Sequence, residues 1–310
     1  MFNINTCRWV IWGAKHPDPY NSFQHIFEAF ERALKYLGKD VLWLGSSDDT
    51  NQMDFDNTCF LSMNTVIFGL PIHDGAFYVI HNILGTSELN YFTGLKLLPF
   101  GIHISTNRYS AGTVEIGPEI FFDKQQRSLS MRWGTDLLPH EIEANKPTEA
   151  FNSDSRVFNY VGSVDESKRS AIWDFSRACR ENGIQYHQYG GYSNGPLVSI
   201  EKHIQLIRDS YLAPAFQEQG QDDQGYIACR LFKNISYGQY GLTRSKYANE
   251  LFGGKLIYNP DAYQLFYQAK ERLLSMPVKE LHDLMDIVAR DFTYVNKVNG
   301  IIEAIKRLDG

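Results

Sequence analysis

Cysteine is scarce in this sequence, and no two cysteines lie close together. Only four occur in 310 residues: Cys7, Cys59, Cys179 and Cys229. A zinc site or a disulfide scaffold needs closely spaced or numerous cysteines, so neither is expected. The sequence also lacks a basic and apolar leader segment, and it contains no apolar run of the ~20 residues that cross a bilayer. These absences predict a soluble cytoplasmic protein with no membrane span.

An excess of positive charge is missing as well. The chain has 30 basic and 36 acidic residues, which gives a net charge of −6. Partners such as nucleic acid or an anionic membrane usually require a basic face, so neither is expected, although a small basic pocket for one nucleotide remains compatible. Hydrophobic residues make up 43% of the chain, which is enough for a sizeable core. A length of 310 residues predicts two domains.

Several common nucleotide-binding and hydrolase motifs are absent. The nearest approach to GxGxxG lies at Gly190–Gly195 and has the wrong spacing, which argues against a nicotinamide-dependent dehydrogenase. No GxxxxGK[ST], GxSxG or HExxH motif occurs. One DxD pair exists, Asp54 and Asp56, but it precedes a strand-like segment, whereas a metal-binding pair of this type should follow one. We interpret it as a solvated turn and expect no metal cofactor.

The order of apolar patterns predicts an α/β fold in the first part of the chain. Residues 22–37 repeat apolar side chains at intervals of three and four, which is typical of a helix that buries one face. Short apolar runs on either side, at 8–13 and 41–44, predict strands of a βαβ unit. Further segments are expected as strands at 58–63, 65–70, 101–105 and 128–133, and as a short helix at 76–84. A polar stretch at 140–155 is interpreted as a linker.

The same alternation restarts after this linker. Strands are expected at 156–161, 184–187, 211–216, 241–243 and 255–259, and helices at 167–181, 199–210, 229–237, 245–252 and throughout the remainder to 307. The sequence therefore predicts two Rossmann-like domains facing each other across a cleft. Their ranges are 1–145 and 146–310, with the last helices able to pack back on the first domain. In such folds ligands bind beyond the carboxyl ends of the strands.

One segment carries a family resemblance. Residues 210–245 read SYLAPAFQEQGQDDQGYIACRLFKNISYGQYGLTRS. The segment is similar to the exostosin-type pattern R-L-F-E-A-I-A-x-G at Arg230, Leu231, Phe232, Ile235 and Gly238. It also resembles the fucosyltransferase pattern Y-[VI]-x-x-K-L-[FW]-R-N, which is matched by Tyr226, Ile227, Arg230, Leu231, Phe232, Lys233 and Asn234. Both families are glycosyltransferases of GT-B architecture, and the match covers about 35 residues of the chain.

The resemblance implies a nucleotide-sugar donor in the second domain. Arg230, in the first turn of a helix, would bind the diphosphate oxygens as negative charge develops on them. Gly162 and Ser163 would let a second helix N-terminus approach the same diphosphate, although a tight turn explains Gly162 equally well. Further donor contacts are expected from Lys233 and Asn234 of the motif and, from their position in the helix after the strand at 241–243 and without a motif match, from Asn249 and Glu250. Tyr189 could stack on the nucleobase, with ordinary packing as the alternative.

Lys233 also bears on the reaction type. It stands where exostosin-type enzymes and many retaining enzymes have a glutamate, so the resemblance favours inversion at the sugar without a metal. The implied donor is GDP-fucose or a UDP-sugar such as UDP-xylose or UDP-galactose, and the acceptor is a glycan hydroxyl. A retaining transferase of the same fold, or a non-catalytic nucleotide- or glycan-binding protein, remain alternatives. Oligomeric state cannot be read from the sequence.

An inverting transfer requires a general base in the first domain. The loop after the first strand offers His16 and Asp18, and in several inverting families the base lies in this loop. A second loop, after the strand expected at 65–70, offers His73 and Asp74. Either histidine could instead be a solvated or capping residue. His25 and His81 are expected within helices and are interpreted as structural.

Overall fold

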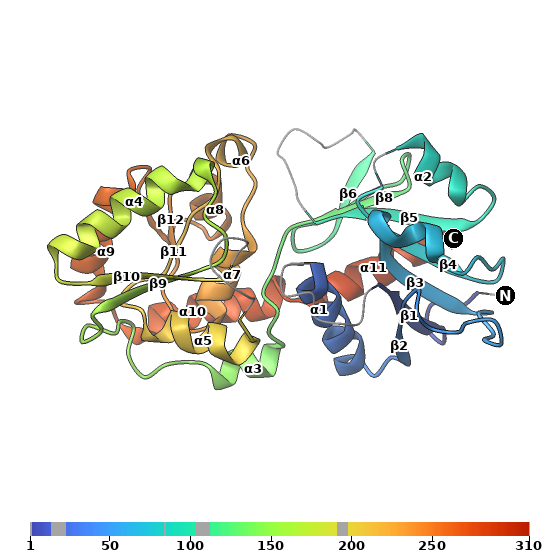
Figure 1. The fold of residues 1–310 in the computed structure, drawn as a ribbon, viewed down its shortest axis with the longest axis horizontal. Coiled ribbons are helices and arrows are strands. Elements are labelled where there is room, and N and C mark those ends of the chain that lie inside the picture. The colour runs from blue at the N-terminus through green and yellow to red at the C-terminus, as the bar shows by residue number, and fades with distance from the viewer. Residues whose placement is uncertain (1, 14–22, 84, 103–111, 191–197, 310) are drawn as a thin grey trace. The chain divides into compact units, whose positions relative to one another are not determined.

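The computed structural model describes residues 2–13, 23–83, 85–102, 112–190 and 198–309, and it divides into two compact units (Figure 1). Among these residues, the first unit holds 2–102, 112–132 and 294–309, and the second holds 133–293. The boundary thus lies between Arg132 and Trp133, earlier than the position expected from the polar linker. The reason is that helix α3 (Pro139–Ala144) packs against α10 (Val278–Asp291) of the second unit.

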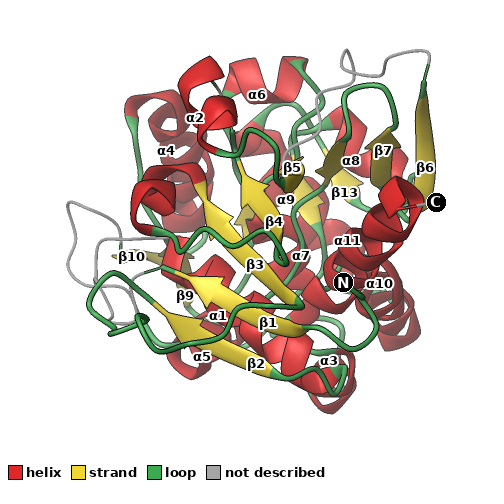
Figure 2. Cartoon of the chain, turned by 90° about the vertical axis from the view of Figure 1, so that its right-hand side faces the viewer, coloured by secondary structure: helices red, strands yellow, loops and turns green. Residues whose placement is uncertain are grey.

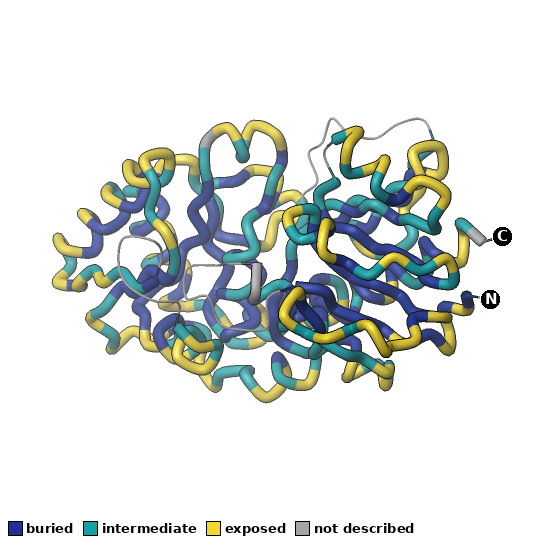
Figure 3. The backbone as a smooth tube through the Cα atoms, turned by 45° about the vertical axis from the view of Figure 1, so that its right-hand side comes forward, coloured by how far each residue is buried: buried dark blue, intermediate teal, exposed yellow. Residues whose placement is uncertain are grey.

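The first unit is built on an eight-stranded sheet with the order β2-β1-β3-β4-β5-β8-β7-β6. Strands β1 to β5 and β8 are parallel, and β7 runs antiparallel to both of its neighbours, β8 and β6. Every residue of β3 and β4 is buried, as expected for central parallel strands covered on both faces (Figures 2 and 3). The strands are β1 (Arg8–Trp12), β2 (Val41–Leu44), β3 (Thr58–Met63), β4 (Phe77–His81), β5 (Lys96–Gly101), β6 (Thr113–Gly117), β7 (Ile120–Asp123) and β8 (Ser128–Met131).

The helices of the first unit come from both ends of the chain. Helix α1 (Phe23–Tyr36) joins β1 to β2 and packs against α11 (Tyr294–Asp309), which also contacts β6, β7 and β8. The α2 helix (Thr86–Tyr91) precedes β5. In Figure 1 the blue α1 and the red α11 lie side by side although they are far apart in sequence.

Two expected elements of the first unit are wrong. Residues 65–70 were expected as a strand, but Asn64–Gly69 forms a 3-10 helix (η1) in which only Ile67 is buried. Residues 76–84 were expected as a helix, but Phe77–His81 is strand β4, paired with β3 and β5. A short, continuous apolar run fits a buried strand and a buried helix equally well, so pairing with neighbouring strands decides between them.

The second unit holds two parallel groups of strands. In the first group β9 (Val157–Val161) pairs with β10 (Gln185–Tyr189). In the second, β12 (Leu242–Thr243) lies between β11 (Pro214–Ala215) and β13 (Ile257–Tyr258). The backbone N–H of Tyr211 donates to the carbonyl of Val157 at 2.7 Å, so the chain entering β11 runs beside β9. The paired strands are thus ordered β10-β9 and β11-β12-β13, with the segment before β11 beside β9.

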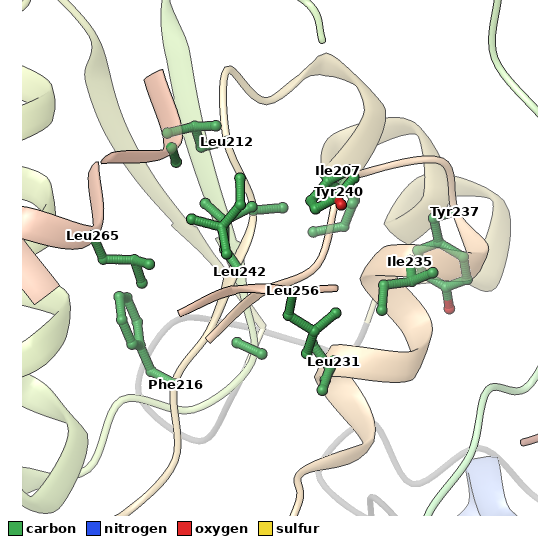
Figure 4. Packing of buried hydrophobic residues seen from close by; sticks show 14 of the residues in the cluster. Ile207, Leu212, Phe216, Leu231, Ile235, Tyr237, Tyr240, Leu242, Leu256 and Leu265 are labelled. Atoms are coloured by element: carbon green, nitrogen blue, oxygen red, sulfur yellow. The ribbon is translucent and has the colours of Figure 1, made fainter. Parts of the chain in front are cut away.

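Helices surround these strands and supply most of the core. They are α4 (Glu166–Glu181), α5 (Ile200–Asp209), α6 (Gln219–Asp223), α7 (Cys229–Ser236), α8 (Lys246–Leu251), α9 (Ala262–Leu273) and α10. Helix α4 packs against α9, and α7 packs against β11 and α10. Leu231 and Ile235 of α7 point into the same cluster as Leu242 and Leu256 (Figure 4). The helix periodicity thus separates a buried face of α7 from the face that carries Arg230.

Both units share one topological feature that locates ligand sites. In each of them the second strand pairs with one side of the first, and the chain then crosses to the other side of the first strand, so the order of strand addition reverses there. Doubly wound sheets of this order bind ligands at that point, beyond the carboxyl ends of the strands. In the second unit this point follows Val161 of β9 and Ala215 of β11. No helix among the described residues is long and apolar enough to cross a membrane.

A buried ion pair attaches the start of the second unit to α7. The ammonium of Lys233 lies 2.7 Å from the carboxylate of Asp136, and both side chains are largely buried. The hydroxyl of Tyr237 donates to the same carboxylate at 2.7 Å. Burial opposes the charge on Asp136, but Lys233 and Tyr237 outweigh it and hold the pKa of Asp136 at about 2. This pair is one reason that the segment after Arg132 belongs to the second unit.

Replacing this carboxylate should destabilise the second unit. Asp136→Asn leaves the Lys233 ammonium buried without a counter-charge, so we expect the free energy of unfolding to fall by about 3–5 kcal/mol in urea titrations at pH 7. Because the pKa of Asp136 is lowered in the folded chain, its stabilisation is present at neutral pH. It is lost as the pH falls from the ordinary value of 3.8 towards 2. Asp136→Asn should therefore lack the part of the acid-induced loss of stability that comes from protonation of this carboxylate.

Two further variants test the same ion pair. Asp136→Asn combined with Lys233→Met should recover part of the loss, since no uncompensated charge remains. Asp283→Asn serves as the matched control, because its partner Lys279 is 80% exposed and such pairs contribute little. Equal destabilisation by Asp136→Asn and Asp283→Asn would contradict a stabilising role for the buried pair.

Candidate functional site

Arg230 lies over the carboxyl end of β9 and is held there by three contacts. Its guanidinium donates to the Tyr160 hydroxyl at 2.7 Å and to the Val161 carbonyl at 2.6 Å. The same group stacks on the Tyr160 ring, 4.1 Å from its centroid. Arg230 is the second residue of α7, as the sequence predicted for a residue in the first turn of a helix. These contacts leave further guanidinium N–H groups available to a ligand.

Gly162 provides the space that Arg230 occupies. Its φ is +127°, and a Cβ atom at this position would lie 2.2 Å from a guanidinium nitrogen of Arg230. The Gly162 N–H donates to the Tyr189 carbonyl at 2.8 Å, and the Gln188 side chain donates to the Gly162 carbonyl at 3.2 Å. Folding therefore brings Gly162, Tyr189 and Arg230 together at the edge where the sequence analysis expected a ligand.

A buried glutamine that the sequence analysis did not single out organises the loop before α7. Gln217 follows β11, and its side-chain amide donates to Asp222 at 2.6 Å. Its side-chain oxygen accepts the N–H of Ala228 at 2.9 Å. These bonds span the residues between β11 and α7 and so fix where α7 begins. The only signal in the sequence that could have singled out Gln217 was its position directly after a strand.

The helix N-terminus expected near Ser163 carries an acidic cap. Asp165 accepts the backbone N–H of Lys168 at 3.2 Å and binds the Lys168 ammonium at 2.7 Å. Burial alone would raise the pKa of Asp165, but the bonds from Lys168 and Ser167 hold it at about 2. Ser163 itself is exposed. The N-terminus of α4 is therefore already occupied by a carboxylate, which differs from the open N-terminus that the sequence suggested.

Two residues expected to contact the donor have partners within the protein. The Lys233 ammonium is bound to Asp136, as described above. Asn234 is 1% exposed and donates its side-chain amide to the Ala213 carbonyl at 2.8 Å. Residues three and four apart in a helix share a face, so both side chains lie on the same side of α7 as Arg230 and differ from it in their partners. The sequence pattern could not show that other segments of the protein bind Lys233 and Asn234, because Asp136 and Ala213 are distant in the chain or outside the motif.

The last two expected donor residues lie on α8, after β12. Asn249 is half-buried, and its side-chain oxygen is enclosed without a hydrogen-bond partner. Glu250 is 56% exposed and lies 3.5 Å from Lys246 of the same helix. Neither residue has a contact with Arg230 or Gly162 among the hydrogen bonds and ion pairs of the described residues.

The structure describes only two of the four candidate general bases of the first unit. His16 and Asp18 lie outside the described residues. His73 and Asp74 were expected beyond the carboxyl end of a strand, but they follow η1 and precede β4, which places them at the amino edge of the sheet. There the His73 N–H donates to the Tyr78 hydroxyl at 2.7 Å, and a His73 ring nitrogen accepts from the Gly75 N–H at 3.1 Å. The expected placement of this loop is therefore wrong.

One histidine occupies the opposite, carboxyl edge. His81 was expected within a helix, but it is the last residue of β4, 3% exposed, with its ring 5.0 Å from that of Phe100. His25 lies in α1, as expected. No group of three or more histidine, cysteine, aspartate or glutamate side chains in the described part of the chain could hold a metal ion.

A surface hollow in the second unit lies away from Arg230. It has a volume of about 420 Å³ and is lined by residues 144 and 146–152 together with Arg208, Gly238 and Gln239. Arg208 donates to the carbonyl of Tyr237 at 3.0 Å and to that of Asn145 at 2.6 Å. Because these segments precede β9 and end α5, the hollow lies at the amino edge of the strands, where doubly wound sheets do not bind their ligands.

Comparisons with known proteins bear on the fold. No protein-family model matches the chain, and no curated protein matches it. Among solved structures, the chain is similar to the trehalose-6-phosphate synthase OtsA with a TM-score of 0.55 and 12% identity, over 97% of this chain and 99% of that one. That structure has the GT-B fold. The resemblance to exostosin-type and fucosyltransferase-type enzymes rests on residues 210–245 alone, whereas the expected fold class is confirmed: the chain consists of two Rossmann-like domains of the GT-B fold.

Proposed function

We propose that this chain is a glycosyltransferase that moves a sugar from a nucleoside-diphosphate donor to a hydroxyl group of a glycan. The observation that carries the proposal is the position of Arg230. Its guanidinium is held by Tyr160 and Val161 over Gly162, at the point of a doubly wound sheet where ligands bind. The GT-B fold of the whole chain supports the same class of reaction.

The chemistry of the donor accounts for this arrangement. When the bond between the sugar and the diphosphate breaks, negative charge develops on the leaving phosphate oxygen. A guanidinium fixed in advance by hydrogen bonds stabilises that charge without reorganising. Arg230 can donate two parallel N–H groups to a phosphate, and the N-terminus of α7 adds a partial positive charge. Together they supply the positive charge that the departing diphosphate requires.

We infer an inverting, metal-independent transfer. The side chain at position 233, where retaining relatives of the exostosin type have a glutamate, is a lysine that binds Asp136. Inversion needs one base near the acceptor hydroxyl. His16 and Asp18 remain the proposed bases because they directly follow β1. His73 and Asp74 precede β4 at the opposite edge and are no longer part of the proposal. The proposed donors remain GDP-fucose and UDP-sugars such as UDP-xylose or UDP-galactose.

Removing the guanidinium of Arg230 should weaken donor binding. We expect Arg230→Ala to weaken the binding of the matching nucleoside diphosphate by about 30-fold or more, measured by calorimetry, because a charge-assisted contact of roughly 2–3 kcal/mol is lost. Arg230→Lys should restore only part of it, since an ammonium cannot bind in a bidentate manner. GDP, UDP, dTDP and CMP are tested in turn, with EDTA present.

A matched arginine provides the control. Arg177 stacks on Tyr263 at 4.6 Å and is half exposed, so Arg177→Ala removes an equivalent stacked guanidinium elsewhere in the unit. Undiminished nucleotide binding by Arg230→Ala would overturn the assignment. If nucleotide-sugars bind but are neither hydrolysed nor transferred, the chain is a binding protein. Proton NMR of the product's anomeric centre separates inversion from retention.

A methyl group at Gly162 should displace Arg230 without changing any charge. We expect Gly162→Ala to lower nucleotide affinity about as much as Arg230→Ala does, because the new Cβ would lie 2.2 Å from the guanidinium. Gly183→Ala is the control. Gly183 also has a positive φ, +73°, but nothing lies within 4 Å of its Cβ position. Backbone strain should lower the free energy of unfolding of both variants by about 1–3 kcal/mol, measured in urea titrations. Only Gly162→Ala should also lose nucleotide affinity, and equal affinities in the two variants would contradict the proposed site.

A further inference from the structure

The surface hollow in the second unit lies where three helices end. Helix α3 ends at Ala144, α5 at Asp209 and α7 at Ser236, and the hollow of about 420 Å³ is lined by residues at or next to these ends. Its volume lies in the range of ~300–1,000 Å³ that is usual for small-ligand pockets. Because helix ends and a loop at the amino edge of the strands form this hollow, a ligand bound there would be separate from the nucleotide-sugar at Arg230.

Arg208 supplies hydrogen-bond donors to this hollow. Its Nε donates to the Tyr237 carbonyl at 3.0 Å, and its Nη2 donates to the carbonyl and the side-chain oxygen of Asn145 at 2.6 and 2.8 Å. Tyr237 and Asn145 are the C-caps of α7 and α3, so the guanidinium lies between the segments that line the hollow. Its Nη1 has no hydrogen bond among the described residues and is not an enclosed atom. Two N–H groups are therefore available to a ligand.

Gln239 supplies an acceptor to the same hollow. Its side chain is 8% exposed, and its amide nitrogen donates to the carbonyls of Ile207 and Ser210 at 3.0 and 2.8 Å. These two bonds fix the orientation of the amide, because a carbonyl oxygen can only accept. The amide oxygen Oε1 has no hydrogen-bond partner in the described part of the chain and is not an enclosed atom. Since Gln239 lines the hollow, this oxygen is available to a ligand that donates a hydrogen bond.

The segment 146–152 forms another wall of the hollow and is anchored at two points. The Nε2 atom of His282 forms a hydrogen bond with the Pro147 carbonyl at 2.8 Å. The Phe151 ring packs edge-on against the Tyr211 ring, with the two centroids 4.8 Å apart. Because Pro147 and Phe151 also line the hollow, its wall includes apolar surface beside the polar groups.

The charges around the hollow favour neither an anion nor a cation. The ammonium of Lys146 is already bound by Glu143 at 2.6 Å and by Asp286 at 2.7 Å. An anion would meet the exposed carboxylate of Glu149 and the partial negative charge of the helix C-termini. A cation would meet the guanidinium of Arg208. A neutral group that both donates and accepts hydrogen bonds fits these surroundings, and a hydroxyl group does both.

We propose that this hollow binds a neutral saccharide. One sugar hydroxyl accepts a hydrogen bond from Nη1 of Arg208, another donates to Oε1 of Gln239, and the C–H groups of the ring pack against Pro147 and Ala150. The inference goes beyond the proposed function, because it assigns a second sugar site that takes no part in the transfer step. In a transferase that acts on a glycan, this site holds a part of the glycan away from the diphosphate at Arg230. The site binds sugar whether or not the chain transfers one.

The test measures sugar binding to the full chain without any nucleotide. Glucose, galactose, mannose, xylose and fucose are titrated at constant ionic strength, with saturation-transfer difference NMR as the readout. Acetate and tetramethylammonium are titrated in the same way as a small anion and a small cation. We expect at least one of the sugars to bind to the wild-type protein and neither ion to do so.

Two variants locate the bound sugar. Thr148 lines the hollow, is exposed and has no hydrogen bond among the described residues, so Thr148→Trp narrows the hollow and leaves the bonds of Arg208 and Gln239 in place. We expect it to weaken sugar binding about 10-fold or more, because the indole occupies space that the ligand needs. Thr86→Trp is the control, since Thr86 is an exposed threonine of the first unit, and it should bind the sugar as the wild type does.

Gln239→Met tests the acceptor itself. It should weaken sugar binding as Thr148→Trp does, and its thermal unfolding shows whether it folds without the bonds to Ile207 and Ser210. The inference is overturned if the wild type binds none of the sugars, if an ion binds in their place, or if Thr148→Trp binds sugar as tightly as the wild type. Failure of the transferase proposal is a separate result, namely that no nucleotide-sugar binds to or is turned over by the wild type.

Discussion

Parallel strands must be covered on both faces, and this constraint determines most of the architecture. A parallel sheet needs a crossover between successive strands, so helices cover both faces and the strands become continuously apolar, as in β3 and β4. The same constraint collects the carboxyl ends of the strands at one edge. Residues far apart in sequence, such as Gly162 and Arg230, then meet beside the end of β9. The candidate donor site is a direct consequence of that arrangement.

Helix α7 connects the stability of the second unit to its candidate site. One face packs Leu231 and Ile235 into the core, and the other carries both Lys233, which binds Asp136, and Arg230, which lies above Gly162. The buried ion pair limits rotation of the helix, because a turn about its axis would separate two charges in a poorly solvated place. The position of the Arg230 guanidinium therefore depends on residues that do not themselves contact the ligand.

Two buried lysines, Lys233 in α7 and Lys297 in α11, show how residues of the same type differ in their electrostatic surroundings. Lys233 resembles a donor-binding residue in the sequence, yet its charge is neutralised by Asp136. Lys297 belongs to no motif, yet its charge has no partner among the described residues. A motif reports residue types along the chain, whereas the electrostatic free energy of a lysine depends on what surrounds it in space.

The sequence by itself determined the alternation of strands and helices, the GT-B fold class and the place of Arg230 at the start of a helix. These follow from local periodicity and from residues close together in the chain. Only the tertiary structure decided that residues 77–81 are a central strand, that His73 and Asp74 lie at the amino edge, and that Lys233 and Asn234 serve the interior of the second unit. The physical reason is that strand pairing, sheet edges and charge partners are contacts between distant segments, which no local pattern contains.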